Sequence, residues 1–129
     1  MALSTIGTNS IADSAVTLGK VDATSTEANN LKQRVAKVWC NLDATGTFGI
    51  SDSFNVSSAT DNGTGDHTVT YDVNFSNANH SVVALADGGR TCDMNDNGPA
   101  ADSVRIRTVN GSNSAEDAND VCMIAFGDS

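Results

Sequence analysis

The chain has 129 residues, of which 39% are hydrophobic and only 5% aromatic, and its formal net charge is −9. This length suits one domain with a terminal segment, and the composition predicts a thin core. The scattered bases exclude a nucleic-acid binder, which needs a basic stripe, and no apolar run approaches the ~20 residues of a membrane span. Residues 1–10 lack the basic start and apolar core of a signal peptide, so we expect a protein made and folded in a cytoplasm.

The small polar residues and the cysteines limit which folds and which stabilising sites the sequence can form. Serine, threonine, asparagine, aspartate and glycine are abundant, which favours β-structure with many turns over a helical bundle. Cys40, Cys92 and Cys122 are odd in number and far apart in sequence, so neither a disulfide framework nor a zinc site is indicated. We interpret them as three small buried hydrophobic side chains.

Residues 1–23 are predicted to form an extended N-terminal arm. The segment is rich in serine, threonine and alanine, and its apolar residues follow neither a strand nor a helix period. Such a segment cannot bury its apolar groups by itself, so it either becomes ordered against another protein or is a disordered terminus. The candidate docking residues of the arm are Ile6, Ile11, Val16, Leu18 and Val21.

Residues 24–36 are predicted to form a short helix, over about 25–36, that makes oligomer contacts. Thr24 to Glu27 matches a capping box, and Ala28, Leu31 and Val35 follow at helical spacing. A helix this short with one narrow apolar stripe is not stable alone. We therefore expect Leu31 and Val35 to pack against the β-domain or against copies of the same helix.

Residues 37–129 are predicted to form an antiparallel β-sandwich or jelly-roll-like domain, because short apolar runs alternate with turn signals. Strands are expected at Val38–Leu42, Phe48–Ile50, Phe54–Val56, Val69–Phe75, Val82–Ala86, Val104–Thr108 and Val121–Phe126.

Three of these segments carry more detailed expectations. The turn at 61–65 contains Asn-Gly, which accepts positive φ. After it, Val69, Tyr71, Val73 and Phe75 alternate with polar residues, as in a half-buried strand with one wet face. The strand at 82–86 is expected to be more buried, and the strand at 121–126 is apolar on both faces and is expected to be central.

A possible calcium loop begins after Cys92. Asp93, Asn95, Asn97 and Gly98 match positions 1, 3, 5 and 6 of such a loop, and their oxygens suit a hard cation. Position 12, however, is a valine instead of glutamate, and no helices flank the segment. We interpret it as a polar surface loop with calcium binding as the alternative, and we expect no other metal and no cofactor.

The histidines and arginines give no catalytic constellation. His67 and His80 lie in or beside strands without a nucleophile elbow, so we expect both to be exposed to solvent. Arg105 and Arg107 share one strand face and are expected to pair with acids across the sheet or a subunit boundary, with an anionic sugar as the alternative.

Trp39 and Tyr71 are the single tryptophan and tyrosine of the chain. Either ring could stack on a sugar. Both lie in strand patterns, however, and we expect them to be core or interface residues.

Four elements of residues 35–84 form a recognisable set: Ala36–Leu42, Thr45–Phe48, Ser53–Ser58 and Asp61–Val69. Together with the ending VRIRTVNGSNSAEDANDVCMIAFGDS at 104–129, they resemble a repeated domain of tail fibres and related appendages in phages of marine and other aquatic bacteria. The segment around Cys92–Pro99 has no counterpart in that pattern. The resemblance brings no catalytic residue to this sequence.

The resemblance implies a structural protein of the bacteriophage virion, displayed on the virion surface. Members of the family typically end long fibre chains, so a short chain with an arm suits a head fibre, a capsid decoration protein or a tail-fibre tip protein. A purely structural cement protein without a receptor is the alternative, and a polysaccharide-active enzyme is a remote one. We predict that the protein is not an enzyme.

The predicted partners are copies of the chain, other virion proteins of the capsid, tail or baseplate, and a glycan or protein of the host surface. A thin core and a helix that cannot stand alone indicate a homo-oligomer, for which a trimer is predicted. Residues expected to contact a ligand in the loops are Asp61, Asn62, Thr64, Asp66, Asp93, Asn95 and Asn97.

Overall fold

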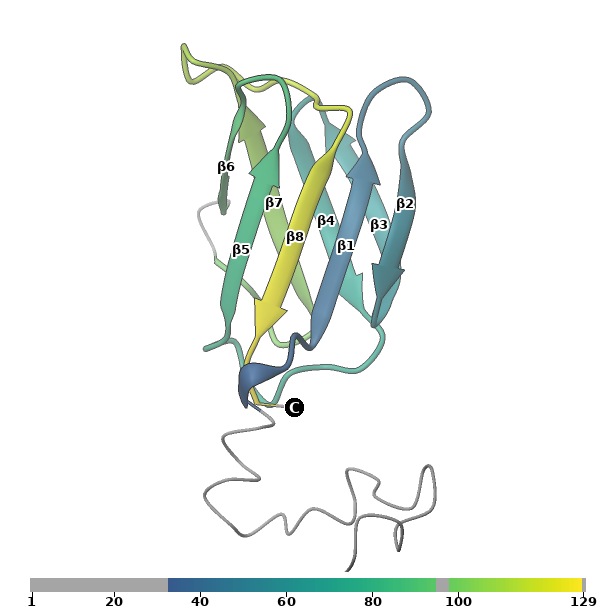
Figure 1. The fold of residues 1–129 in the computed structure, drawn as a ribbon, viewed down its shortest axis with the longest axis vertical. Coiled ribbons are helices and arrows are strands. Elements are labelled where there is room, and N and C mark those ends of the chain that lie inside the picture. Colours follow the sequence, from purple (N-terminus) through teal and green to yellow (C-terminus); the bar gives the residue numbers. More distant parts are fainter. Residues whose placement is uncertain (1–32, 95–97, 129) are drawn as a thin grey trace, which may run out of the picture. The chain divides into compact units, whose positions relative to one another are not determined.

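The computed structural model describes residues 33–94 and 98–128, which form two antiparallel four-stranded sheets packed face to face (Figure 1). The predicted all-β sandwich is therefore confirmed. The strands are β1 Val38–Asp43, β2 Gly49–Phe54, β3 Val56–Gly63, β4 Asp66–Tyr71, β5 Ser81–Ala86, β6 Thr91–Met94, β7 Ser103–Val109 and β8 Val121–Phe126.

The strand order interleaves distant parts of the chain. Sheet A has the order β2-β1-β8-β5, and sheet B has the order β3-β4-β7-β6. Each of the hairpins β1–β2, β3–β4 and β6–β7 stays within one sheet, while the other connections cross between the sheets (Figure 1). The prediction that Val121–Phe126 is central is confirmed, because β8 pairs with β1 on one side and with β5 on the other.

The core lies between the sheets and is built by period-2 alternation. Leu42 of sheet A and Ile106 of sheet B are completely buried, and burial of one such side chain contributes roughly 1.5–3 kcal/mol. The other buried apolar residues of the strands are Val38, Cys40, Val69, Tyr71, Val104, Val109, Val121, Met123 and Ala125.

The turn between β3 and β4 is shorter than predicted. Asp61 and Asn62 belong to β3, and the chain reverses at Thr64–Gly65. Gly65 has φ 64°. Its N–H donates a 2.6 Å hydrogen bond to Asp117 Oδ1, and its carbonyl accepts a 2.9 Å bond from the N–H of Thr108. These two hydrogen bonds hold the turn against Thr108 and Asp117.

The predicted strand 69–75 is also shorter, because β4 ends at Tyr71. The chain then leaves sheet B, so the alternation breaks: Val73 is 60% exposed, while Phe75 is buried. The side chain of Asn55 fixes this exit. Its Nδ2 donates 3.0 Å bonds to the carbonyls of Lys37 and Val73, and its Oδ1 accepts a 2.6 Å bond from the N–H of Val73.

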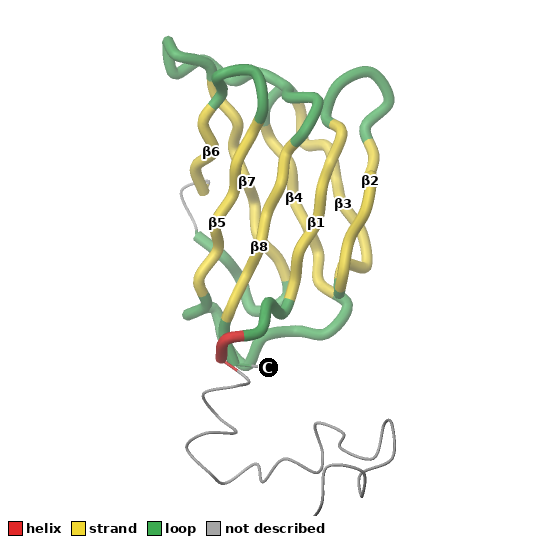
Figure 2. The backbone as a smooth tube through the Cα atoms, viewed as in Figure 1, coloured by secondary structure: helices red, strands yellow, loops and turns green. Residues whose placement is uncertain are grey.

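Part of the predicted organisation lies outside the described residues. A helical turn is assigned at residues 33–34 (Figure 2), and Val35 beyond it is exposed. Residues 35 and 36 are not helical, so the helix ends two residues earlier than predicted. Its part before residue 33 stays a prediction, as does the arm. The residues concerned are Ile6, Ile11, Val16, Leu18, Val21 and Leu31.

Candidate interaction surface

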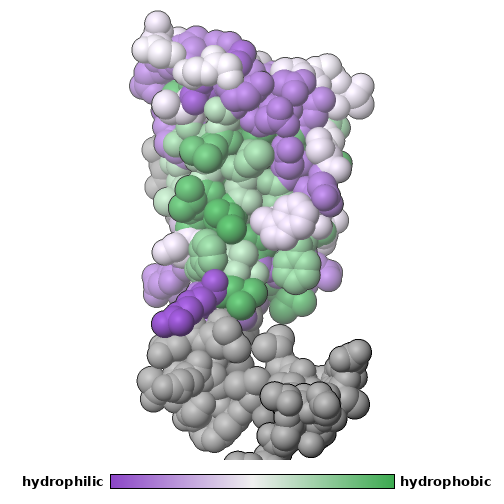
Figure 3. Space-filling view, viewed as in Figure 1, coloured by the Kyte–Doolittle hydropathy of each residue, from purple (hydrophilic) through white to green (hydrophobic). Residues whose placement is uncertain are grey.

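The outer face of sheet A is apolar. We call this surface the apolar face, and it consists of Trp39, Phe54, Val83, Leu85, Cys122, Ile124 and Phe126. Leu85 is 69% exposed, and Phe54 and Val83 are each 55% exposed. Figure 3 shows apolar side chains gathered over the middle of this sheet, with hydrophilic residues beyond one end.

Strand register aligns the apolar face in rows. Phe54 lies opposite Trp39, Trp39 opposite Ile124, and Ile124 opposite Val83, so one apolar row crosses all four strands. Cys122 and Leu85 form the apolar half of the next row, and Asn41 and Asp52 form its polar half. Because neighbouring strands lie about 4.8 Å apart, these side chains form one continuous surface.

This face corrects two expectations from the sequence. The strand at 82–86 was expected to be more buried, but Val83 and Leu85 point to solvent. Cys122 was expected to be buried and is exposed, whereas Cys40 is buried and Cys92 partly so. Burial raises the pKa of Cys40 to about 12. Trp39 lies on the apolar face and Tyr71 in the core, as expected for interface or core residues.

The two ends of the apolar face differ in charge. Arg34 and Lys37 lie where β1 begins, and the Gln33 side chain donates to Asp128 Oδ1 at the same end. At the opposite end Asp43 closes β1. Asp120 and Asp87 lie there too, since the N–H of Asp87 donates a 3.0 Å bond to the carbonyl of Asp120. One end thus mixes bases with acids, including Asp72, which lines a hollow with Lys37. Among the described residues, the other end has three aspartates and one base, Arg90, which lies 3.9 Å from Asp87, so it is acidic.

The outer face of sheet B is polar and its charges are paired. Asp66 accepts from Arg105 at both carboxylate oxygens, with 2.7 Å from Nε to Oδ1. Asp93 accepts from Arg107 Nε at 3.0 Å and from Nη2 at 2.9 Å. These hydrogen bonds hold the pKa of both carboxyl groups below its usual range. The prediction that both arginines pair with acids across the sheet is confirmed.

We expect Asp66→Asn to lower the free energy of unfolding by less than about 1 kcal/mol at pH 7, because the pair is partly exposed to solvent. The lowered pKa of Asp66 makes this stabilisation present above the ordinary pKa and lost as pH falls below about 4. Urea denaturation at low and high salt measures the difference in free energy of unfolding between the variant and the parent protein. This difference should shrink in 1 M salt, and a salt-independent loss of several kcal/mol would contradict a solvent-exposed ion pair.

The predicted ligand-contact residues are spread over strands and one turn. Asp66 and Asp93 come together on sheet B, where both lie opposite Arg107 in neighbouring strands. Asn62 Nδ2 donates a 2.8 Å bond to Thr68 Oγ1, and Thr64 lies in the turn. Asp61 Oδ1 accepts from the N–H of Gly63 at 2.9 Å. Asn95 and Asn97 lie outside the described residues.

The sequence did not predict β6. Its four residues follow turn-like chemistry in the sequence, yet Asp93 pairs with Arg107 of β7. Asp93 is thus held by an arginine inside a strand, so the first position of the candidate calcium loop is engaged.

Both histidines are buried, contrary to expectation. His67 stacks on Phe48 with the ring centroids 5.4 Å apart, and neither of its ring nitrogens has a hydrogen-bond partner among the described residues. Burial lowers the pKa of His67, against the opposing effect of nearby aspartates. His80 differs because its Nε2 lies 3.1 Å from Tyr71 Oη and its ring stacks on Phe75 at 3.9 Å.

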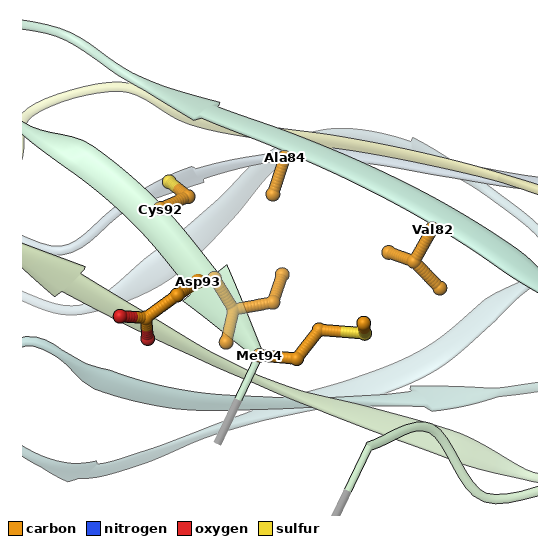
Figure 4. Close-up of a pocket in the computed structure, with 6 residues that line it drawn as sticks. Val82, Ala84, Cys92, Asp93 and Met94 are labelled. Atoms are coloured by element: carbon orange, nitrogen blue, oxygen red, sulfur yellow. The ribbon is translucent and has the colours of Figure 1, made fainter. Parts of the chain in front are cut away.

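A cavity of about 170 Å³ opens between β5 and the β6–β7 hairpin (Figure 4). Its lining is apolar apart from Asp93, whose carboxylate is bound by Arg107. Burial raises the pKa of Cys92 in its wall to about 11, so this thiol is protonated at neutral pH. The remaining lining residues are Val82, Ala84, Met94 and Ile106.

No family model, curated protein or solved structure matches the chain. Within residues 33–94 and 98–128, no three histidine, cysteine, aspartate or glutamate side chains are grouped so that they could hold a metal ion. The same part of the chain contains no helix of the length and apolarity needed to cross a membrane.

Proposed function

We propose that this chain is a structural protein of a bacteriophage virion: a surface appendage such as a head fibre, a decoration protein or a tail-fibre tip. Its N-terminal arm, residues 1–23, would anchor it to the particle, and the β-sandwich would be displayed for attachment to the host surface. The resemblance in the sequence supports the phage assignment. The contrast between the two outer faces of the sandwich supports a role in assembly.

This contrast carries the proposal. The apolar face presents a row of four large or branched side chains to solvent, and contiguous exposed apolar patches typically mark interaction sites. Sheet B instead presents paired charges and hydroxyl groups, as expected of a surface that stays exposed to solvent. A domain with one face suited to protein and one suited to water fits a component of a larger particle.

The partners follow from this division. Copies of the chain or other virion proteins would cover the apolar face and bind the arm at Ile6, Ile11, Val16, Leu18 and Val21. A host-surface glycan would meet the polar face, where Asn62, Thr64, Asp66 and Asp93 offer hydrogen-bonding groups. The proposal involves no catalytic residue, cofactor or nucleic acid.

We expect an antibody raised against the purified protein to label intact virions in electron microscopy. Label on the head would make the protein a decoration or head-fibre protein, and label on the tail would make it an adsorption component. Preimmune serum, and particles of an unrelated phage, are the controls. Absence of label on particles whose lysate contains the protein would contradict the proposed function.

A further inference from the structure

We infer that the apolar face binds a second copy of this chain, and that the two copies pack face to face with antiparallel strands, about a twofold axis that lies between the two faces and runs across the strands. The inference deepens the proposed function by naming the partner of one surface. It rests on that function only in treating the apolar face as an assembly surface. The grounds are the uncharged centre of the face, its dimensions and the charges at its two ends.

The centre of the face is suited to an identical surface. The row Phe54, Trp39, Ile124 and Val83 carries no charge, so it can be buried against its copy without burying an ion, and Asp52 of the next row lies on the edge strand β2. Two packed sheets lie about 10 Å apart with their side chains interdigitated. In the antiparallel pair each strand lies over the same strand of the other copy, so the rings of Phe54 and Trp39 meet rings, and the branched residues of β8 and β5 meet branched residues.

The area of the apolar face indicates how tightly two copies bind. Four strands of six residues give a face of about 20 by 19 Å, or roughly 400 Å² of footprint. This is about half of the ~800 Å² that each partner buries in a standard stable interface. The pair should therefore be reversible and dependent on protein concentration.

The charges at the two ends of the apolar face favour the antiparallel orientation of the two copies. In an antiparallel pair, Arg34 and Lys37 of one copy lie over the acidic end of the other, which contains Asp43, Asp87 and Asp120. A parallel pair, like a parallel trimer about the face, would bring the acidic ends together in a chain whose net charge is already −9. Like charges that face each other disfavour a complex.

Opposite orientation is compatible with anchoring by the arm. The 23 residues proposed as the arm can span at most about 80 Å when extended, whereas a six-residue strand is about 20 Å long. Arms that start at opposite ends of the pair can therefore reach one supporting surface.

Sedimentation velocity on the full chain over a range of concentrations tests the contact. We expect a monomer–dimer equilibrium, and we expect Val83→Asp with Leu85→Asp to raise the dissociation constant at least a hundredfold. The matched control places two aspartates on β3 of sheet B, at Ser58 and Thr60, which are also exposed. This control should dimerise like the parent protein, and circular dichroism should show that both variants are folded.

A charge reversal tests the orientation. Asp120→Lys should weaken an antiparallel pair by about tenfold at low salt, because it places a lysine over Lys37 of the other copy. The same change would strengthen a parallel pair by relieving acid–acid repulsion. Adding Lys37→Glu to Asp120→Lys should restore the antiparallel pair.

A cross-link locates the contact independently. Cys122 is the exposed one of the three thiols, and the strand and sheet spacings put the two copies of it within about 15 Å. A bismaleimide linker should give a dimer that Cys122→Ser abolishes and Cys92→Ser preserves.

Three results would overturn the inference: a monomer at every concentration, a trimer, or a dimer that the sheet A variant leaves intact. None of them bears on whether an antibody labels the virion, so failure of the pair and failure of the proposed function are distinguishable.

Discussion

Replacing Gly65 with alanine should lower the free energy of unfolding by about 3 kcal/mol or more. Gly65 has φ 64°, which costs an L-residue roughly 1–2 kcal/mol. A Cβ there would also lie 2.7 Å from the backbone nitrogen of Glu116 and closer still to the carbonyl oxygen of Thr108. Relief would require the turn to move away from β7, which breaks the hydrogen bond between Thr108 and Gly65. Urea denaturation measures the loss.

Gly46→Ala is the matched control. Gly46 has φ 62°, but nothing lies within 4 Å of an added Cβ. It should therefore show the conformational cost alone, about 1 kcal/mol. Equal losses in the two variants would mean that the β3–β4 turn is not docked against β7 as described.

The second prediction with a large effect concerns the stability of the fold at acidic pH. Stability should fall as pH drops from 7 to 5, because burial holds the pKa of His67 below its ordinary value of about 6.5. The unfolded chain then binds a proton that the folded chain resists. The contribution of His67 is thus fully present above the ordinary pKa and is lost as pH falls towards the folded pKa.

His67→Leu should remove this dependence and raise stability at pH 7 by about 1–2 kcal/mol. The reason is that the imidazole is buried without a hydrogen-bond partner among the described residues, which costs free energy that leucine avoids. Unfolding curves in urea between pH 5 and 8 measure both effects. The three carboxylates of the described residues with a lowered pKa, Asp66, Asp93 and Glu116, change charge at lower pH than ordinary carboxylates, so they do not contribute to the change between pH 7 and 5.

His80→Leu is the control for this prediction. Its ring lies within hydrogen-bond distance of Tyr71 Oη, so removal leaves a buried hydroxyl without that partner and should destabilise the fold by about 1 kcal/mol. The two histidine variants should therefore change stability in opposite directions. A pH profile of His67→Leu that still parallels the parent protein would disprove the role given to His67.

The sequence predicts strands well where alternation is strict. Val69 and Tyr71 alternate with threonines, and both are buried in β4. Alternation does not tell how far a strand continues, because Val73 fits the same pattern and points to solvent after the chain has left the sheet. The turn was likewise placed in the correct segment, while its end at Gly65 depends on a close approach to β7 that only the tertiary structure creates.

The apolar face could not be predicted from the same patterns. A run such as Val82–Ala86 is apolar at every position, so it looks like a strand buried on both sides. Which side is covered depends on the second sheet, and here Val83 and Leu85 lie on the uncovered side. The prediction for His67 is wrong for a related reason: a polar ring between Asp66 and Thr68 suggests exposure to solvent, yet the strand register turns it inward.

The position of β8 in the middle of sheet A has a consequence for how the protein is synthesised. β1 and β5 have no common neighbour in the sheet until residues 121–126 arrive between them. During translation these residues emerge after the other seven strands, so sheet A can close only once β8 has left the ribosome. Until then the apolar strand β5 lacks its partner, and pairing of segments so distant in sequence is slow. A ribosome-bound chain that ends before β8 should therefore be sensitive to protease and bind chaperones, and a longer one from which β8 has emerged should show neither.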